Sequence, residues 1–159
     1  MQLEQLDLPG GGLLTVYLRD CVETMPLAME RPLVLVVPGG GYSHLSAREG
    51  DPVALQFAAA GYHTAVLRYA VGDDAAHGLP LRQLAAAIGL VRQHAAAWHV
   101  LPDKIAVCGF SAGGHLALSG AVLAVPGLPD PPRPDAVILG YPVITACLLY
   151  TSPSPRDCS

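Results

Sequence analysis

The residues best suited to covalent chemistry are 109–113, Gly-Phe-Ser-Ala-Gly, which match a G-x-S-x-G motif with Ser111 at its centre. The apolar run 104–108 before the motif predicts a buried strand, and the apolar stretch 116–123 after it predicts a helix. Such a tight strand-to-helix turn strains its central residue and exposes that side chain, and small neighbours let adjacent backbone approach. Ser111 is therefore predicted to be a nucleophile above a helix N-terminus, where developing negative charge is stabilised.

A second glycine-rich segment, residues 38–42 (Pro-Gly-Gly-Gly-Tyr), follows the aliphatic run 33–37. An unbroken aliphatic run bounded by prolines is typical of a central strand covered on both faces. Glycines at the end of such a strand can turn their N–H groups outward, and acyl transfer needs such donors for the oxyanion. We expect an oxyanion hole formed by the backbone N–H groups of Gly40, Gly41 and Ala112. The alternative is a glycine-rich turn beside an incidental serine.

No cofactor or metal site is expected. The glycines of segment 39–44 differ from a dinucleotide-binding fingerprint, because the third position is His44 and the residue about twenty positions on is Ala59 rather than an acid. The sequence also contains no G-x-x-x-x-G-K-[ST] motif. Two aspartates and a histidine share the loop 72–78, but without a further ligand cluster they are expected to be solvated loop residues.

Four segments together resemble the α/β-hydrolase superfamily, and most closely its small carbohydrate-esterase and acetylesterase-like members, which are related to hormone-sensitive-lipase and prolyl-oligopeptidase-type hydrolases. The segments are 38–42, 48–54, 66–69 and 109–117, and the resemblance runs from about residue 12 to Thr145. Pro38 stands where the lipase-like branch usually has His, whereas the acetylesterase-like branch commonly has Pro.

This resemblance implies an α/β fold class, a three-layer α/β/α sandwich with a mostly parallel sheet. It also implies a serine hydrolase that cleaves small-acyl carboxylic esters, acetyl esters above all, through an acyl-enzyme on Ser111. A prolyl-oligopeptidase-like peptidase is permitted by the same motifs. A third alternative is a non-catalytic remnant or binding module that keeps the oxyanion-binding backbone.

The C-terminal part departs from the family pattern. The superfamily order is Ser, then Asp or Glu, then His, with the acid many tens of residues after the nucleophile. Only 48 residues follow Ser111, and no His lies beyond His115. Segment 147–159 has two Ser-Pro steps and no hydrophobic period, and it resembles a translated adapter or vector read-through, the alternative being a native disordered tail. We therefore expect an incomplete, N-terminal hydrolase domain over 1–146, a non-family tail, and a chain that is inactive or nearly so.

An upstream histidine is not expected to replace the missing base. Activation of a serine requires hydrogen-bond reach and a third, orienting group. His115 comes one helical turn after Ser111 and is expected to pack under the turn, and His44 is the only candidate near the mouth of the site. The other histidines are His63, His77, His94 and His99.

Composition limits the partners. Hydrophobic residues make up 52% of the 159 residues and charged residues 14%, against a usual charged share of about 25%. The net charge of −4 argues against nucleic acid and anionic membranes, and a small-molecule ester is the expected partner. The first residues lack the features of a signal peptide, no long apolar span is present, and the four cysteines form no CxxC pair, which favours a cytoplasmic location. The oligomeric state is left open.

The remaining pattern alternates strands and helices. Strands are expected over 14–18, 33–37, 63–69 and 135–144. A capping box, Ser46-x-x-Glu49, predicts the start of a helix that ends at Gly61, or that helix starts at Asp51 with a proline in its first turn. A further helix begins near residue 80, with one apolar stripe formed by Leu81, Leu84, Ile88, Val91, Ala95 and Trp98. Alternation of this kind predicts a parallel sheet that binds ligands at the carboxyl ends of its strands.

Overall fold

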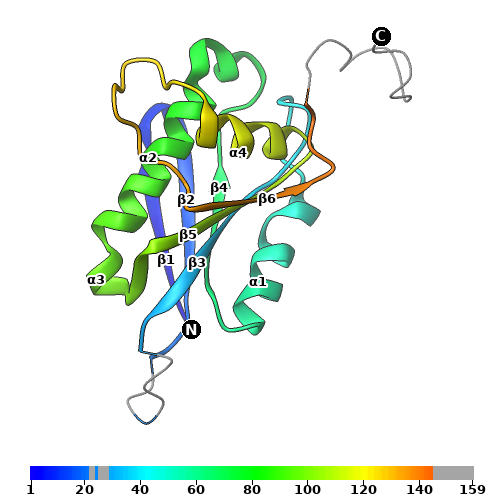
Figure 1. The fold of residues 1–159 in the computed structure, drawn as a ribbon. Coiled ribbons are helices and arrows are strands. Elements are labelled where there is room, and N and C mark those ends of the chain that lie inside the picture. Colours follow the sequence, from blue (N-terminus) through cyan, green and yellow to red (C-terminus); the bar gives the residue numbers. More distant parts are fainter. Residues whose placement is uncertain (22–23, 25–28, 145–159) are drawn as a thin grey trace.

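A six-stranded sheet forms the middle of the molecule in a computed structural model that describes residues 1–21, 24 and 29–144 (Figure 1). The segment 147–159, for which we expected a non-family tail, lies outside the described residues. The strand order is β1-β2-β4-β3-β5-β6. The strands are β1 Gln2–Leu8, β2 Gly12–Leu18, β3 Arg31–Val37, β4 His63–Arg68, β5 Val100–Phe110 and β6 Ala136–Gly140.

The sheet is parallel where strands and helices alternate and antiparallel at one edge. Strands β4, β3, β5 and β6 run parallel to one another, whereas β2 pairs antiparallel with both β1 and β4. We did not predict β1 from the sequence. Its side chains are largely exposed, and the leucines of Gln2–Leu8 do not alternate strictly with polar residues, so a period of two is hard to detect.

Helices cover both faces of the sheet, which confirms the expected three-layer arrangement (Figure 1). Helix α1 (Asp51–Ala59) packs on one face against a small apolar cluster that includes Val34, Val36 and Cys108. The other face carries α2 (Leu79–Gln93), α3 (Ala95–Trp98) and α4 (Ala112–Val122) over the larger core. Short 3₁₀ segments are η1 Pro9–Gly11, η3 Ala47–Glu49 and η4 Gly72–Gly78.

The apolar stripe predicted from helical spacing lies in the larger core. Five of its six members are buried there, and Leu81 is partly buried against the same cluster. The single expected helix is divided, because α2 ends at Gln93 and the backbone leaves helical geometry at His94 before α3 begins. Spacing alone does not reveal this division, since Ala95 and Trp98 keep the apolar face.

The capping box predicted at Ser46 and Glu49 is wrong. Helix α1 begins at Asp51 with Pro52 in its first turn, which confirms the alternative start, and neither η3 nor α1 has a side-chain cap hydrogen bond. The Glu49 carboxylate instead accepts hydrogen bonds from groups distant in sequence. Both carboxylate oxygens of Glu49 thus bond to other segments, and neither bonds to Ser46 as a capping box requires.

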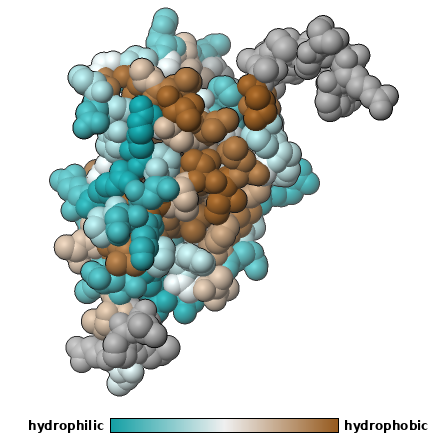
Figure 2. All heavy atoms as spheres, viewed as in Figure 1, coloured by the Kyte–Doolittle hydropathy of each residue, from teal (hydrophilic) through white to brown (hydrophobic). Residues whose placement is uncertain are grey.

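Strand β6 forms an edge of the sheet and exposes much of its apolar surface. Ile138 and Leu139 are exposed on this strand, and Tyr141 is exposed directly after it. Apolar side chains gather across the middle of the visible face in Figure 2, where β6 crosses in Figure 1. Within the described ranges, none of the helices is both long and apolar enough to cross a membrane.

Candidate active site

The two glycine-rich segments leave the sheet side by side. Strands β3 and β5 are parallel neighbours, and their register ends with Val37 opposite Gly109. We call residues 109–113 the elbow and residues 38–42 the glycine loop. Because neighbouring parallel strands end at the same edge, the elbow and the glycine loop meet above that edge. Their parallel pairing agrees with the parallel sheet predicted from the alternation of strands and helices.

Ser111 has the strained backbone that its position in the motif predicts. Its φ is 51° and its ψ is −117°, in a region that side chains other than glycine rarely occupy. The Ser111 N–H donates to the Gly140 carbonyl (3.0 Å), and the Ser111 carbonyl accepts from the N–H groups of Val143 (3.1 Å) and His115 (3.0 Å). Bonds from α4 and from the end of β6 therefore hold the half-buried Ser111 in this conformation.

Two glycines allow the elbow and the glycine loop to approach each other closely. A Cβ on Gly39 would lie 2.7 Å from the Phe110 carbonyl oxygen and 3.0 Å from the Ser111 Cβ. A Cβ on Gly113 would overlap the carbonyl oxygens at the end of β3. Since neither position has room for a side chain, glycine is required at both for this packing.

The glycine loop turns sharply and leaves two backbone donors free. The Gly40 carbonyl accepts hydrogen bonds from the N–H groups of Ser43 (3.1 Å) and His44 (3.2 Å), and φ is positive at Gly40, Gly41 and Tyr42. Among the described residues, the N–H groups of Gly40 and Gly41 have no acceptor. Ala112, the third expected oxyanion donor, is the first residue of α4, where helix N–H groups have no partner within the helix.

The Glu49 side chain bonds to two segments beside the elbow, the glycine loop and the turn after β6. The sequence analysis did not predict these bonds. One carboxylate oxygen accepts the Gly39 N–H at 2.8 Å, and the other accepts the Tyr141 hydroxyl at 2.7 Å. The bond to Glu49 raises the pKa of the Tyr141 hydroxyl. No sequence pattern indicates the contact with Tyr141, because 92 positions separate the two residues.

His115 pairs with a tyrosine of the glycine loop. The Tyr42 hydroxyl and the His115 Nδ1 lie 2.8 Å apart. The Tyr42 ring also packs edge-on against Tyr69, whose hydroxyl donates to the Pro38 carbonyl at 2.6 Å. Burial raises the pKa of Tyr42 to about 12, so this hydroxyl stays protonated at neutral pH.

None of the six histidines, all within the described ranges, has a hydrogen bond to the Ser111 hydroxyl. His44 is exposed, and its Nδ1 lies 3.0 Å from the Ser43 hydroxyl. His63 is fully buried where β4 begins, at the opposite end of that strand from the site. His94 stacks on Trp98, and the others are His77, His99 and His115.

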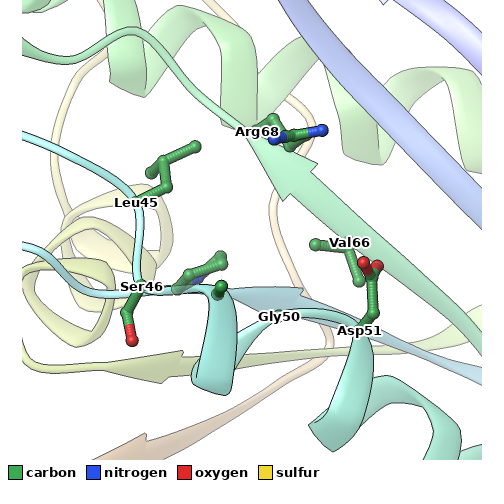
Figure 3. A pocket seen from close by; sticks show the side chains of 8 residues that line it. Leu45, Ser46, Gly50, Asp51, Val66 and Arg68 are labelled. Carbon is green, nitrogen blue, oxygen red and sulfur yellow. The ribbon is translucent and has the colours of Figure 1, made fainter.

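A small pocket of about 120 Å³ lies beside the glycine loop, on the side of α1 (Figure 3). Its lining includes Pro38, Ser46, Asp51 and Arg68. Asp51 accepts the Tyr17 hydroxyl at 2.8 Å, and this bond adds to burial in raising the pKa of Tyr17 to about 12. In the part of the chain that the structure describes, no three His, Cys, Asp or Glu residues are grouped so as to hold a metal ion.

Comparisons with known proteins agree with this geometry. The family model described as BD-FAE matches residues 22–126. An acetylxylan esterase of Xylanibacter ruminicola is 34% identical over 115 residues, which are 70% of this chain and 22% of that protein. Endo-1,4-beta-xylanase B of Butyrivibrio fibrisolvens is 35% identical over 127 residues, which are 74% of this chain and 20% of that protein.

Solved structures show the same similarity in three dimensions. The carboxylesterase Cest-2923 from Lactobacillus plantarum superposes with a TM-score of 0.82 at 34% sequence identity. The superposition covers 99% of this chain and 62% of Cest-2923. The chain thus spans about a fifth of the two curated relatives and less than two thirds of this structural neighbour.

Proposed function

Because the chain belongs to the BD-FAE family of α/β-hydrolases, we propose that it carries the nucleophile and the oxyanion hole of a serine hydrolase that cleaves carboxylic esters with small acyl groups. One observation supports this most directly. Ser111 has its strained backbone (φ 51°) at the end of β5 and packs against the glycine loop, whose free N–H groups belong to Gly40 and Gly41.

In the proposed reaction, the Ser111 Oγ attacks the ester carbonyl carbon while a general base takes its proton. The carbonyl oxygen becomes an oxyanion, which accepts hydrogen bonds from the N–H groups of Gly40, Gly41 and Ala112. The C–O bond to the alcohol then breaks, the alcohol leaves with the proton from the base, and an acyl-enzyme remains on Ser111. Water hydrolyses this ester by the same steps and restores the serine.

The base and its acid partner are proposed to come from sequence that this chain does not contain. The superfamily order puts both after the nucleophile, and the chain spans 62% of Cest-2923. The histidines of the chain are engaged elsewhere or exposed, as His115 is with Tyr42 and His63 is at the far end of β4. We therefore expect the chain alone to be a very poor esterase.

Acetyl esters are the proposed substrates, and the support for them is the acetylxylan esterase that resembles 70% of the chain. Glycosidic bond cleavage, which the name of the Butyrivibrio relative describes, uses a pair of carboxyl groups that flank the scissile bond. The carboxylate next to the elbow, Glu49, instead accepts bonds from Gly39 and Tyr141. We therefore propose the esterase and not the glycosidase reaction for this chain.

Hydrolysis of p-nitrophenyl acetate tests the proposal in two forms of the protein, the 159-residue chain and a form that continues in the genomic reading frame past codon 146. We expect the first to retain roughly a thousand-fold rate over water, and the second to be far faster, since the triad contributes about a million-fold. Ser111→Ala should abolish turnover in the extended form. Equal turnover with and without Ser111 would refute the serine mechanism and favour a non-catalytic role.

A further inference from the structure

The Glu49 carboxylate connects the two segments that flank the elbow. Its Oε2 accepts the N–H of Gly39 in the glycine loop, and its Oε1 accepts the hydroxyl of Tyr141, the residue after β6. We call Glu49, Gly39 and Tyr141 the Glu49 clamp. No other described side chain bonds to both segments, so this carboxylate is a direct connection between them.

On the side of the glycine loop, the clamp fixes the peptide that precedes the free donors. A hydrogen bond to a carboxylate is stronger than a neutral one, so the Gly39 N–H is held toward Glu49. This N–H is therefore not available to an oxyanion, whereas those of Gly40 and Gly41 remain free. The position of Gly39 also sets how closely the loop approaches Ser111, because a Cβ at Gly39 would reach both Ser111 and the Glu49 Oε2.

On the side of β6, the clamp holds the turn that bonds the backbone of Ser111. Tyr141 lies between Gly140, which accepts the Ser111 N–H, and Val143, which donates to the Ser111 carbonyl. The Tyr141 backbone has a positive φ of 37°, which is unusual for a residue with a side chain. The bond to Glu49 and the packing of its ring on Phe110, with centroids 5.7 Å apart, hold it in this conformation.

We propose that Glu49 is a positioning residue of the oxyanion hole, which fixes the glycine loop at its working distance from Ser111 by binding Gly39 and Tyr141 at once. This inference rests on the proposed esterase function. A negative charge beside a developing oxyanion is unfavourable, so Glu49 acts through the backbone it holds and does not stabilise the oxyanion directly. Glu49 forms no capping hydrogen bond with Ser46, and both of its carboxylate oxygens are engaged in the clamp.

Three variants test the clamp, Glu49→Ala, Glu49→Gln and Tyr141→Phe, with Glu4→Ala as the matched control, each made in the 159-residue chain and in the form extended past codon 146. Glu4 is also half-buried and also accepts one side-chain hydrogen bond, but it lies in β1. The first readout is hydrogen exchange of the backbone amides of residues 39–41. Glu49→Ala should speed exchange at Gly39 by about ten-fold or more, because a bond to a charged acceptor is lost. Glu49→Gln keeps one acceptor oxygen and should have a smaller effect.

The second readout is the Ser111-dependent hydrolysis of p-nitrophenyl acetate by the same variants in the form extended past codon 146. A misplaced oxyanion hole should lower kcat by about ten- to a hundred-fold in Glu49→Ala while KM stays within about two-fold, since removal of one oxyanion donor costs roughly a hundred- to a thousand-fold. Glu49→Gln should recover most of the loss, Tyr141→Phe should fall between the two, and Glu4→Ala should match the parent. Unfolding midpoints show whether each variant is folded. If Glu49→Ala is not folded, the test is made with Glu49→Gln.

The outcomes separate this inference from the proposed function. Unchanged exchange at residues 39–41 in Glu49→Ala and Glu49→Gln would overturn the clamp, whatever the activity. A loss that appears in KM and not in kcat would assign Glu49 to substrate binding and would also overturn it. If Ser111→Ala leaves hydrolysis by the extended form unchanged, the esterase function fails and the catalytic role of the clamp fails with it, while faster exchange would still establish the contact with Gly39.

Discussion

Val37 and Gly109 are the last paired residues of β3 and β5. Beyond this pair the two strands continue as the glycine loop and the elbow, so the free N–H groups of the loop and the hydroxyl of Ser111 belong to adjacent segments. A shift of the register would separate them, and two glycines without room for a Cβ, Gly39 and Gly113, keep the segments in contact. The chemistry proposed for the chain depends on this one pairing.

Gly39→Ala should damage both the fold and the site. The added Cβ would lie within 3.0 Å of backbone and side-chain atoms of the elbow and of Glu49, so we expect a loss of about 1–3 kcal/mol in the free energy of unfolding. Ser111-dependent ester hydrolysis by the form extended past codon 146 should fall by about a hundred-fold, because the oxyanion donors move. Urea unfolding and p-nitrophenyl acetate assays measure the two effects.

Gly89→Ala is the matched control for this prediction. Gly89 lies within α2, and its added Cβ would meet only a proline side chain, at 3.3 Å. The free energy of unfolding should stay within about 1 kcal/mol of the parent value, because alanine also favours the helix. If Gly39→Ala behaves like Gly89→Ala, the close approach of loop and elbow is wrong.

The strained backbone of Ser111 should lower the free energy of unfolding, and glycine at this position should relieve the strain. A backbone conformation of this kind costs about 1–3 kcal/mol in residues with a side chain, whereas glycine adopts it freely at an entropic cost of about 0.5–1 kcal/mol. We therefore expect Ser111→Gly to be more stable than Ser111→Ala by about 1 kcal/mol, and both variants to lose the proposed nucleophile. Chemical unfolding of the two variants side by side measures the difference, and equal stability would argue against strain at Ser111.

The sequence indicated the elements of the site because their signals are local. The elbow and the glycine loop each combine an apolar run with small residues at fixed positions, and the structure has strands β3 and β5 where those runs occur. The expected mostly parallel sheet agrees with four parallel strands, β4, β3, β5 and β6. The roles of Ser111 and of the oxyanion donors stay predictions.

Two features that the sequence did not indicate, the contacts of Glu49 and strand β1, depend on hydrogen bonds to another segment. Glu49 looked like part of a capping box with Ser46, yet its carboxylate bonds to Tyr141, 92 positions away. Strand β1 is stabilised by its pairing with β2 and not by a hydrophobic pattern of its own. Local propensity could not reveal either feature, because hydrogen bonds to another segment decided both, a distant one for Glu49 and the next strand for β1.

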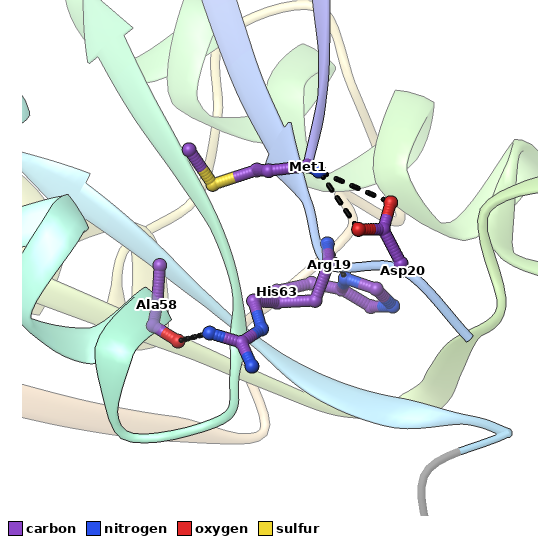
Figure 4. A network of polar contacts seen from close by, with 5 residues as sticks. All are labelled: Met1, Arg19, Asp20, Ala58 and His63. Atoms are coloured by element: carbon purple, nitrogen blue, oxygen red, sulfur yellow. Dashed lines mark hydrogen bonds and ion pairs between the residues drawn. The ribbon is translucent and has the colours of Figure 1, made fainter. Parts of the chain in front are cut away.

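His63 should make the stability of the chain depend on pH. Its ring is fully buried, and its Nδ1 accepts the Arg19 N–H at 3.0 Å (Figure 4). Its Nε2 lies 3.2 Å from the His99 carbonyl oxygen. Burial, together with nearby charges that include those of Arg31 and Arg19, lowers the pKa of His63 from 6.5 to about 4. The folded state therefore holds this ring neutral in a pH range where the unfolded chain protonates it.

Acidic pH should therefore lower the free energy of unfolding. The contribution of His63 to stability is fully present above pH 6.5 and is lost as the pH falls from 6.5 to about 4, with a total of about 3 kcal/mol. Urea unfolding at pH 7, 5.5 and 4.5 measures the loss, and NMR titration of the ring measures the pKa itself. Titration of His63 near 6.5 would refute the prediction.

If Ser111 is the nucleophile, it carries the acyl group during turnover, and mass spectrometry of the acid-quenched protein detects that group on the serine. The form extended past codon 146 is mixed with p-nitrophenyl acetate, quenched within the first turnover, digested and sequenced. We expect one added acetyl group on the Ser111 side chain of the peptide that contains the elbow, and none in Ser111→Ala. An acetyl group on another residue, or rapid hydrolysis with no acylated serine at any quench time, would contradict it.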